Sequence, residues 1–107
     1  MKKLIEDALR DTGLDYFYIK RARNVFPCIV YTYNELPHAL GDNTEESTRY
    51  DIYFNLIIKK DLTDTTKLVK DILKKHGFMK VIINTPIMFE DTDYYQITMQ
   101  YVKSKAI

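Results

Sequence analysis

The chain has 107 residues, 46% of them hydrophobic and 29% charged, and its 16 basic residues nearly balance its 15 acidic residues. That length and composition are those of one globular domain spanning residues 1–107. A net charge of +1 argues against a dedicated nucleic-acid-binding protein, because such proteins usually carry a strong basic excess.

The sequence offers no targeting or membrane signal. No run approaches about 18 consecutive apolar residues, so we expect no membrane-spanning segment. Lys2 and Lys3 are followed at once by Glu6 and Asp7, which leaves no apolar core for a signal peptide. The single cysteine, Cys28, cannot form an internal disulfide. These features predict a protein of a reducing cytoplasm.

The first predicted element is a short helix over residues 3–11. Its apolar side chains recur at helical spacing and form one stripe, namely Leu4, Ile5, Ala8 and Leu9. Gly13 suits the left-handed position that follows a helix. A helix this short is marginal alone, so we expect it to dock on a sheet or on a neighbouring subunit.

Two segments with strand character follow. Residues 15–20 predict a short strand or an irregular approach to one, and residues 21–24 predict a basic turn. Residues 26–33 predict a second strand, which begins at Pro27 or lies at a sheet edge, because proline has no backbone N–H to donate. Cys28 then occupies the position of a small buried hydrophobe rather than of a nucleophile.

Residues 34–48 form the longest stretch without periodicity, and we interpret them as a long flexible loop. The segment contains no lysine or arginine, so its formal charge is −4. Its acidic residues are Glu35, Asp42, Glu45 and Glu46.

The remaining elements are a strand, a helix and two further strands. Residues 49–60 alternate apolar and polar side chains over about twice the usual strand length, which predicts a bulge or a free-standing projection. A helix from a cap at residues 61–65 to about His76 follows, and Gly77 ends it. Strands are predicted at 81–83 and 94–102, with a turn at 89–93 and a frayed tail at 103–107.

This order of elements predicts an α+β fold in two layers, with two helices packed on one face of a mostly antiparallel sheet. The pattern contains no catalytic, cofactor-binding or metal-binding constellation. Only two histidines, His38 and His76, are present, and the three glycines are too far apart for a phosphate-binding loop. We therefore expect a protein that is not an enzyme and that uses no cofactor.

One basic and aromatic patch stands out in the first third of the chain. A basic cluster of Lys20, Arg21 and Arg23 lies there directly after Tyr16 and Tyr18. Such a patch can stack on single-stranded nucleic acid, but three charges in a turn more often form a solvated corner or an ion pair between subunits. We take these residues, together with Tyr53, as candidate contacts to another subunit or a partner.

Several stretches of the chain, taken in order, resemble a known family. They are YIK at 18–20, FPCIVY at 26–31, YDI at 50–52, KKHGF at 74–78 and YYQITMQY at 94–101. Their order resembles that of the tail-completion, or tail-terminator, proteins that join head to tail in long-tailed bacteriophages. The resemblance covers essentially the whole chain as an order of elements and includes no catalytic signature.

The resemblance implies a virion structural protein of a phage or prophage. Proteins of that family form hexameric rings that cap the tail tube and then dock on the head connector, or stopper, so the implied partners are copies of itself, the tube protein and the connector protein. They would assemble in the host cytoplasm and remain at the head-proximal end of the tail.

Under that reading, the loop with Glu35, Asp42, Glu45 and Glu46 would line the channel. It would repel DNA phosphates, so that DNA passes without specific binding. The alternative that the sequence leaves open is a small adaptor or regulatory module, which would bind a basic protein partner through the same acidic loop.

Overall fold

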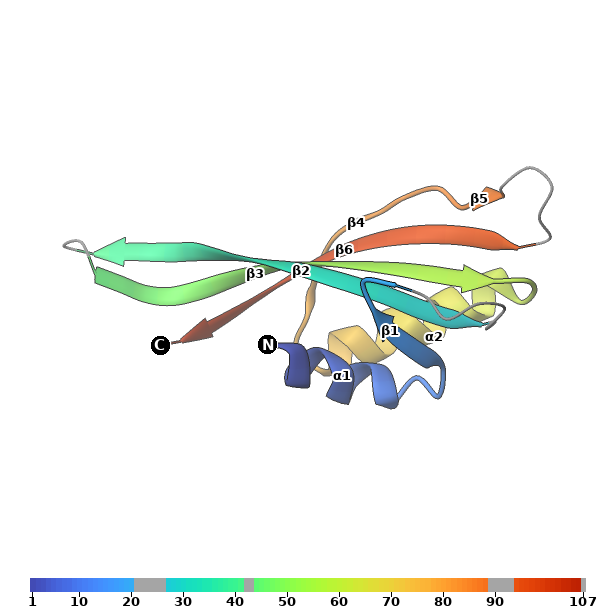
Figure 1. Ribbon diagram of the computed structural model, residues 1–107, viewed down its shortest axis with the longest axis horizontal. Helices are drawn as coiled ribbons and strands as arrows, with labels where there is room; N and C mark the ends of the chain where they lie inside the picture. Colours follow the sequence, from blue (N-terminus) through green and yellow to red (C-terminus); the bar gives the residue numbers. More distant parts are fainter. Residues whose placement is uncertain (21–26, 42–43, 89–93, 107) are drawn as a thin grey trace.

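The computed structural model describes residues 1–20, 27–41, 44–88 and 94–106, and for residues 36–41, 44–48 and 105–106 it describes the backbone. Figure 1 shows its elements. They are α1 (Lys2–Arg10), β1 (Asp15–Tyr18), β2 (Cys28–Gly41), β3 (Thr44–Ile58), α2 (Leu62–Lys75), β4 (Met79–Ile83), β5 (Ile87–Met88) and β6 (Tyr95–Ala106). The predicted α+β class is confirmed.

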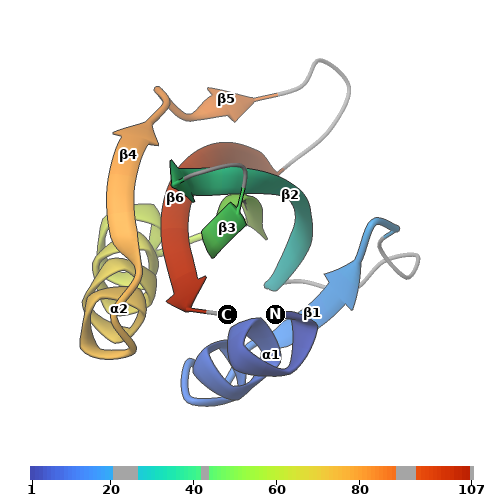
Figure 2. The same ribbon diagram turned by 90° about the vertical axis from the view of Figure 1, so that its left-hand side faces the viewer.

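The strands form a mixed, mostly antiparallel sheet in the order β1-β2-β3-β6-β4. β1 pairs with β2 in parallel, whereas every other pairing is antiparallel. β5 pairs with the beginning of β6 and β4 pairs with a later part of it. Among the described strands, β1 therefore forms one edge of the sheet, and β4 and β5 together form the other. Figure 2, turned to face one end of the molecule, shows how strongly the sheet is curved between these edges.

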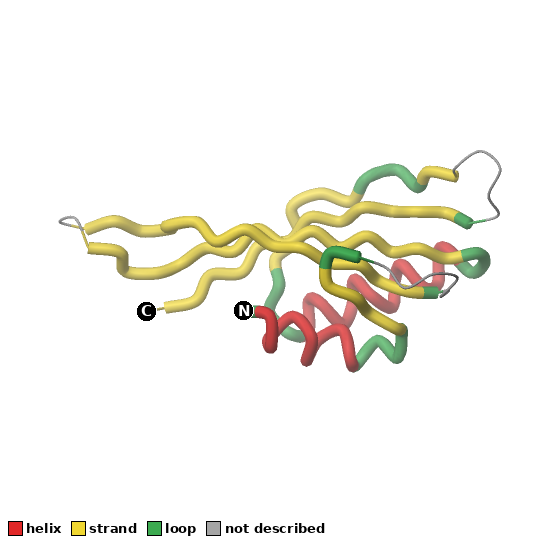
Figure 3. The backbone as a smooth tube through the Cα atoms, in the orientation of Figure 1, coloured by secondary structure: helices red, strands yellow, loops and turns green. Residues whose placement is uncertain are grey.

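Both helices lie on the same face of the sheet, as the sequence predicts (Figures 1 and 3). Ile5, Ala8 and Leu9 of α1 are fully buried against the strands, which confirms that this short helix docks on the sheet. Val69 and Leu73 of α2 are also fully buried. The strand side chains that complete this core alternate along the chain, as in Ile52, Phe54, Leu56 and Ile58 of β3.

The two helices end where the sequence predicts. Gly13 and Gly77 both have positive φ angles, of 75° and 85°, which glycine adopts without steric cost. At the end of α2, Lys103 of β6 donates a hydrogen bond from its Nζ to the carbonyl oxygen of His76, at 3.3 Å. A cation thus satisfies a carbonyl at the negative end of the helix dipole. At the other end of α2, the cap position Asp61 makes no capping hydrogen bond with its side chain.

The prediction of a loop over residues 34–48 is wrong. β2 and β3 stay paired from Cys28 opposite Ile57 to Gly41 opposite Thr44, so most of this segment is a long hairpin. Register shifts on either side of Ala39 mark an irregularity in β2. Because the segment lacks apolar alternation, its sequence carried no strand signal, and backbone pairing supplies the order instead.

We call the part of the hairpin from residue 34 to residue 51 the arm. It extends beyond the helices, so that the molecule measures 53 Å along one axis and 25 Å or less along the others (Figures 1 and 3). The last part of β6 pairs with its base, from Ser47 opposite Ala106 to Tyr50 opposite Lys103. The predicted fraying after residue 102 is therefore also wrong as far as residue 106.

Candidate interaction surfaces

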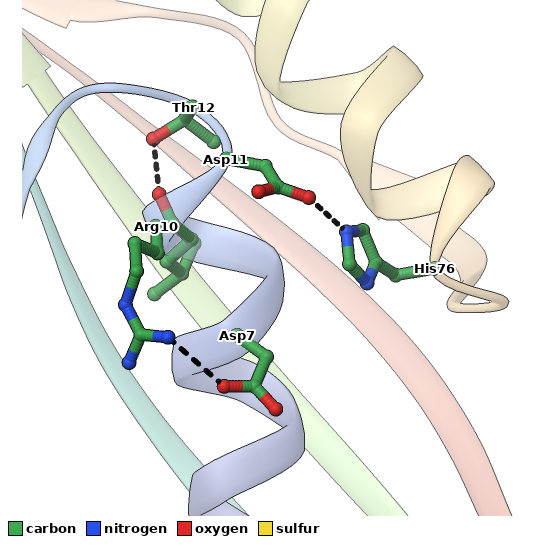
Figure 4. A network of polar contacts seen from close by, with 6 residues as sticks. Asp7, Arg10, Asp11, Thr12 and His76 are labelled. Atoms are coloured by element: carbon green, nitrogen blue, oxygen red, sulfur yellow. Dashed lines mark hydrogen bonds and ion pairs between the residues drawn. The ribbon is translucent and has the colours of Figure 1, made fainter.

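His76 serves to join the two helices. It occupies the C-cap position of α2, as predicted, and its Nε2 lies 2.6 Å from Oδ2 of Asp11, the C-cap residue of α1 (Figure 4). A carboxylate at a helix C-terminus is disfavoured by the helix dipole, and an imidazole that donates to it offsets that cost. The side chain of His38 lies outside the described residues.

The neighbouring contacts in Figure 4 also stabilise the end of α1. The hydroxyl of Thr12 donates to the carbonyl oxygen of Leu9 at 2.6 Å, and Arg10 pairs with Asp7 at 3.3 Å. These groups have structural partners and form no open site. Within the described ranges, no three His, Cys, Asp or Glu side chains gather as metal ligands would.

Cys28 is fully buried, as predicted, but on the face of the sheet that the helices leave uncovered. It forms a small second core with Val30 and Ile57, against which Phe17 and Tyr94 pack. Both faces of the sheet therefore carry buried side chains at β2 and β3. The thiol is a packing group here.

The candidate channel residues all belong to the arm. Glu35 is exposed in β2, whereas the side chains of Glu45 and Glu46, in β3, and the whole of Asp42 lie outside what the structure describes. The backbone nevertheless places Glu35, Glu45 and Glu46 on one projecting hairpin instead of along a loop on the body. Their charge is therefore carried away from the two helices.

The predicted basic and aromatic patch lies at the β1 edge. Tyr16 and Tyr18 belong to β1 on the helix-covered face, and the exposed Lys20 follows that strand. Arg21 and Arg23 lie outside the described residues. Tyr53 is half-buried in β3 on the opposite face of the sheet, across from Thr32. The structure therefore does not bring Tyr53 together with the other candidates.

Tyr18 belongs to a cluster of tyrosine rings that continues toward the arm. Its ring centroid lies 5.3 Å from that of Tyr31 and 5.8 Å from that of Tyr33, and Tyr33 lies 6.1 Å from Tyr50. Nζ of Lys2 lies 5.0 Å from the centre of the Tyr18 ring. We call these four rings the tyrosine row. Tyr18, at the edge of the row, is 40% exposed and available for a further contact.

The buried member of the row is also bonded to α1. The hydroxyl of Tyr31 donates to Oε2 of Glu6 at 2.5 Å. Burial, and then this hydrogen bond to a carboxylate, raise the pKa of Tyr31 well above the ordinary value for tyrosine. The bond holds α1 against β2 at the base of the arm.

Sequence reasoning missed a second surface, at the opposite edge of the sheet. Five large apolar side chains are between 48% and 69% exposed there, which are Met79, Val81 and Ile82 of β4 and Ile87 and Met88 of β5. We call them the apolar edge. Singly exposed apolar residues are ordinary, but a group along an open strand edge is an aggregation hazard unless something covers it. The apolar run at 81–83 indicated a strand, but not its place at an edge.

No protein-family model matches the chain, and comparison with curated proteins likewise found no match. In the part of the chain that the structure describes, neither helix is long and apolar enough to cross a membrane. The arm and the two edges of the sheet are therefore the candidate interaction surfaces of this protein.

Proposed function

We propose that this protein is a phage or prophage tail-completion protein, which closes the tail tube as a ring and joins the tail to the head connector. The observation that carries the proposal is the acidic arm, which projects from a small body whose sheet has two open edges of different composition. The order of elements that suggested the family is consistent with this architecture.

The two edges support ring formation. One edge presents Tyr18 and, next to it, Ile19, which is 64% exposed, whereas the other presents the apolar edge. When two different surfaces of identical subunits meet, the contact is heterologous and generates a closed ring if the rotation permits. The apolar edge of each copy would then be covered by the tyrosine side of the next.

The arm supports a role in DNA passage. Its charge of −4 is unrelieved by any lysine or arginine between residues 34 and 48. In a ring, several such arms pointing inward would surround the channel with negative charge, which repels phosphates and prevents DNA from sticking. A surface meant to hold DNA would carry the opposite charge.

The test begins with the mass of the purified chain in solution across a wide concentration range, by light scattering after size exclusion. Purified tail tubes are then added and examined by negative-stain microscopy. We expect rings of about six subunits, either free or at tube ends. A chain that stays monomeric and leaves tube ends bare at all concentrations would overturn the proposal and favour an adaptor.

Variants make the test specific to the edges. Ile82→Glu and Ile87→Glu place charges in the apolar edge and should abolish assembly without unfolding the body, because both side chains are more than half exposed. The matched control is Leu68→Glu, at a position on α2 that is 42% exposed and lies outside both edges. This control should assemble normally.

A further inference from the structure

A groove runs along α2 on the side that faces β4 and β6. It consists of two hollows, of about 350 Å³ and about 530 Å³, which share Lys70 and Asp71 in their walls. Along α2 its lining residues run from Leu62 to Lys74. At 1.5 Å per helical residue this span is about 18 Å, the length of five or six residues of extended chain.

The hollow near the end of α2 is basic. Three lysines line it, Lys70 and Lys74 from α2 and Lys80 from β4, above a floor that includes Phe78 and Tyr101. The carboxylate in its wall, Asp71, is already paired with Lys67 at 2.9 Å. The hollow therefore presents positive charge over an aromatic floor.

The hollow near the start of α2 is mainly apolar. Leu62, Ile83, Pro86 and Ile97 line it. Thr66 also lines it, and this residue is only 9% exposed. Within the described residues, its hydroxyl oxygen has no hydrogen-bond partner. A buried polar group without a partner costs about 1–3 kcal/mol, and because this oxygen is closed off from solvent, the cost belongs to the packing of α2 and is not a contact for a bound molecule.

From these features we infer that the groove binds an extended segment of a partner protein that carries apolar side chains at one end and carboxylates at the other. The apolar end fills the hollow beside Ile83 and Ile97, and the carboxylates meet Lys70, Lys74 and Lys80.

Two features favour a peptide over a small anion. The groove is longer than any simple anion, and its larger hollow is lined mostly by carbon. On the side of the sheet, the groove is walled by Lys80 and Ile83 of β4 and by Pro86. The site does not depend on the proposed ring, because every group that builds it belongs to one copy.

The probes are two blocked hexapeptides of opposite direction, each with three leucines at one end and three glutamates at the other, added to the isotopically labelled full chain. Binding is followed by amide chemical shifts in NMR and by fluorescence anisotropy. We expect one of the two peptides to bind with a sub-millimolar Kd, with shifts concentrated at Thr66, Lys70, Ile83 and Lys80. Affinity should fall as salt rises.

Variants separate charge from shape. Lys70→Glu and Lys80→Glu should each weaken binding at least tenfold, whereas Thr66→Val, which preserves the shape of the side chain, should leave binding nearly unchanged. Lys75→Glu, on the same helix but outside the groove, is the matched control and should bind normally. Thermal melting of each variant confirms that it is folded.

Three results would overturn the inference. The first is equal binding of matched peptides with lysine in place of glutamate. The second is a set of shifts that maps outside the groove or survives Lys70→Glu and Lys80→Glu. The third is saturation by acetate alone at the affinity of the peptide, which would mean an anion site and no peptide groove. Light scattering of the same samples reports assembly separately, so failure of the groove and failure of the ring are distinguishable.

Discussion

The body and the arm of this protein are held in shape by different forces. In the body, two helices cover one face of the sheet, and Phe54 and Leu73 lie among fully buried side chains. In the arm, the same two strands continue beyond the helices, and pairing with each other and with β6 is what orders the backbone. Burial stabilises the body, whereas hydrogen bonding along the strands extends that order into the arm.

Because the two regions are stabilised differently, they tolerate substitution differently. A region held by burial cannot change without loss of stability, whereas a region held by strand pairing can change its side chains freely. The body therefore fixes the fold, and the arm is free to carry charge. The following experiments test this division, from the largest expected effect on stability to the smallest.

Phe54→Ala should cause the largest loss of stability. The Phe54 ring is fully buried and meets Phe78 and Tyr101 edge to face, with centroids 6.4 Å and 5.8 Å away. Removing it should lower the free energy of unfolding by about 3–5 kcal/mol, measured by urea denaturation. Asn34→Ala, at an exposed position in the arm, should change it by less than about 0.5 kcal/mol. A comparable loss from both would contradict the division.

Alkaline pH should destabilise the body through its buried tyrosines. Burial raises the pKa of both Tyr31 and Tyr101, so above about pH 10 the unfolded chain releases these protons while the folded chain keeps them. Stability should therefore be constant with respect to these groups below pH 10. Above it, stability should fall by up to about 1.4 kcal/mol per pH unit for each tyrosine, until the pH passes the pKa of that tyrosine in the folded chain.

Tyr31→Phe isolates one of these groups. The variant should show a shallower fall in stability between pH 10 and pH 12, as measured by urea denaturation at each pH. At neutral pH it should lose about 1–3 kcal/mol, because Glu6 loses a hydrogen bond to its carboxylate. An unchanged alkaline slope would mean that Tyr31 ionises in the folded protein as it does in the unfolded chain.

The sequence predicted the body well, because side chains that are buried on one face recur as apolar residues at the period of the strand or helix. The alternation from Ile52 to Ile58, the stripe of α1, and Gly13 and Gly77 after the helices all followed from local rules. The arm shows no such pattern, because residues 34–48 do not alternate apolar and polar side chains, although their backbone pairs as strands.

The apolar edge and the groove could not be predicted from local sequence patterns, because both depend on how the elements pack together. Whether Ile82 lies at an edge depends on the order of strands in the sheet, which β6 sets by inserting between β3 and β4. Likewise, Thr66 fits an ordinary helical pattern, and only the packing of α2 on the sheet leaves its hydroxyl buried without a partner among the described residues.

Removing the arm should leave the body folded. Replacing residues 37–48 by Asn-Gly would join Leu36 to Arg49, which face each other in the hairpin, through a two-residue turn. The shortened protein should keep its far-ultraviolet circular dichroism per residue for the body and melt within a few degrees of the parent. Cooperative loss of structure would show that the arm supports the body and would contradict the division. If the proposed function holds, this protein would still assemble.

The smallest effect on stability and the largest on the proposed function should come from reversing the charge of the arm. Asp42, Glu45 and Glu46 replaced by lysine should leave the melting temperature nearly unchanged, because Glu45 and Glu46 belong to the arm and none of the three is part of the helix-covered core. If the arms surround the channel, the reversed charge attracts DNA phosphates, so complementation of a phage lacking the protein should yield assembled particles with reduced infectivity. The neutral amides Asp42→Asn, Glu45→Gln and Glu46→Gln form the matched control and should fall between parent and lysine variant. Normal infectivity of a correctly assembled lysine variant would mean that the acidic arm does not face DNA, even if the body still forms the ring.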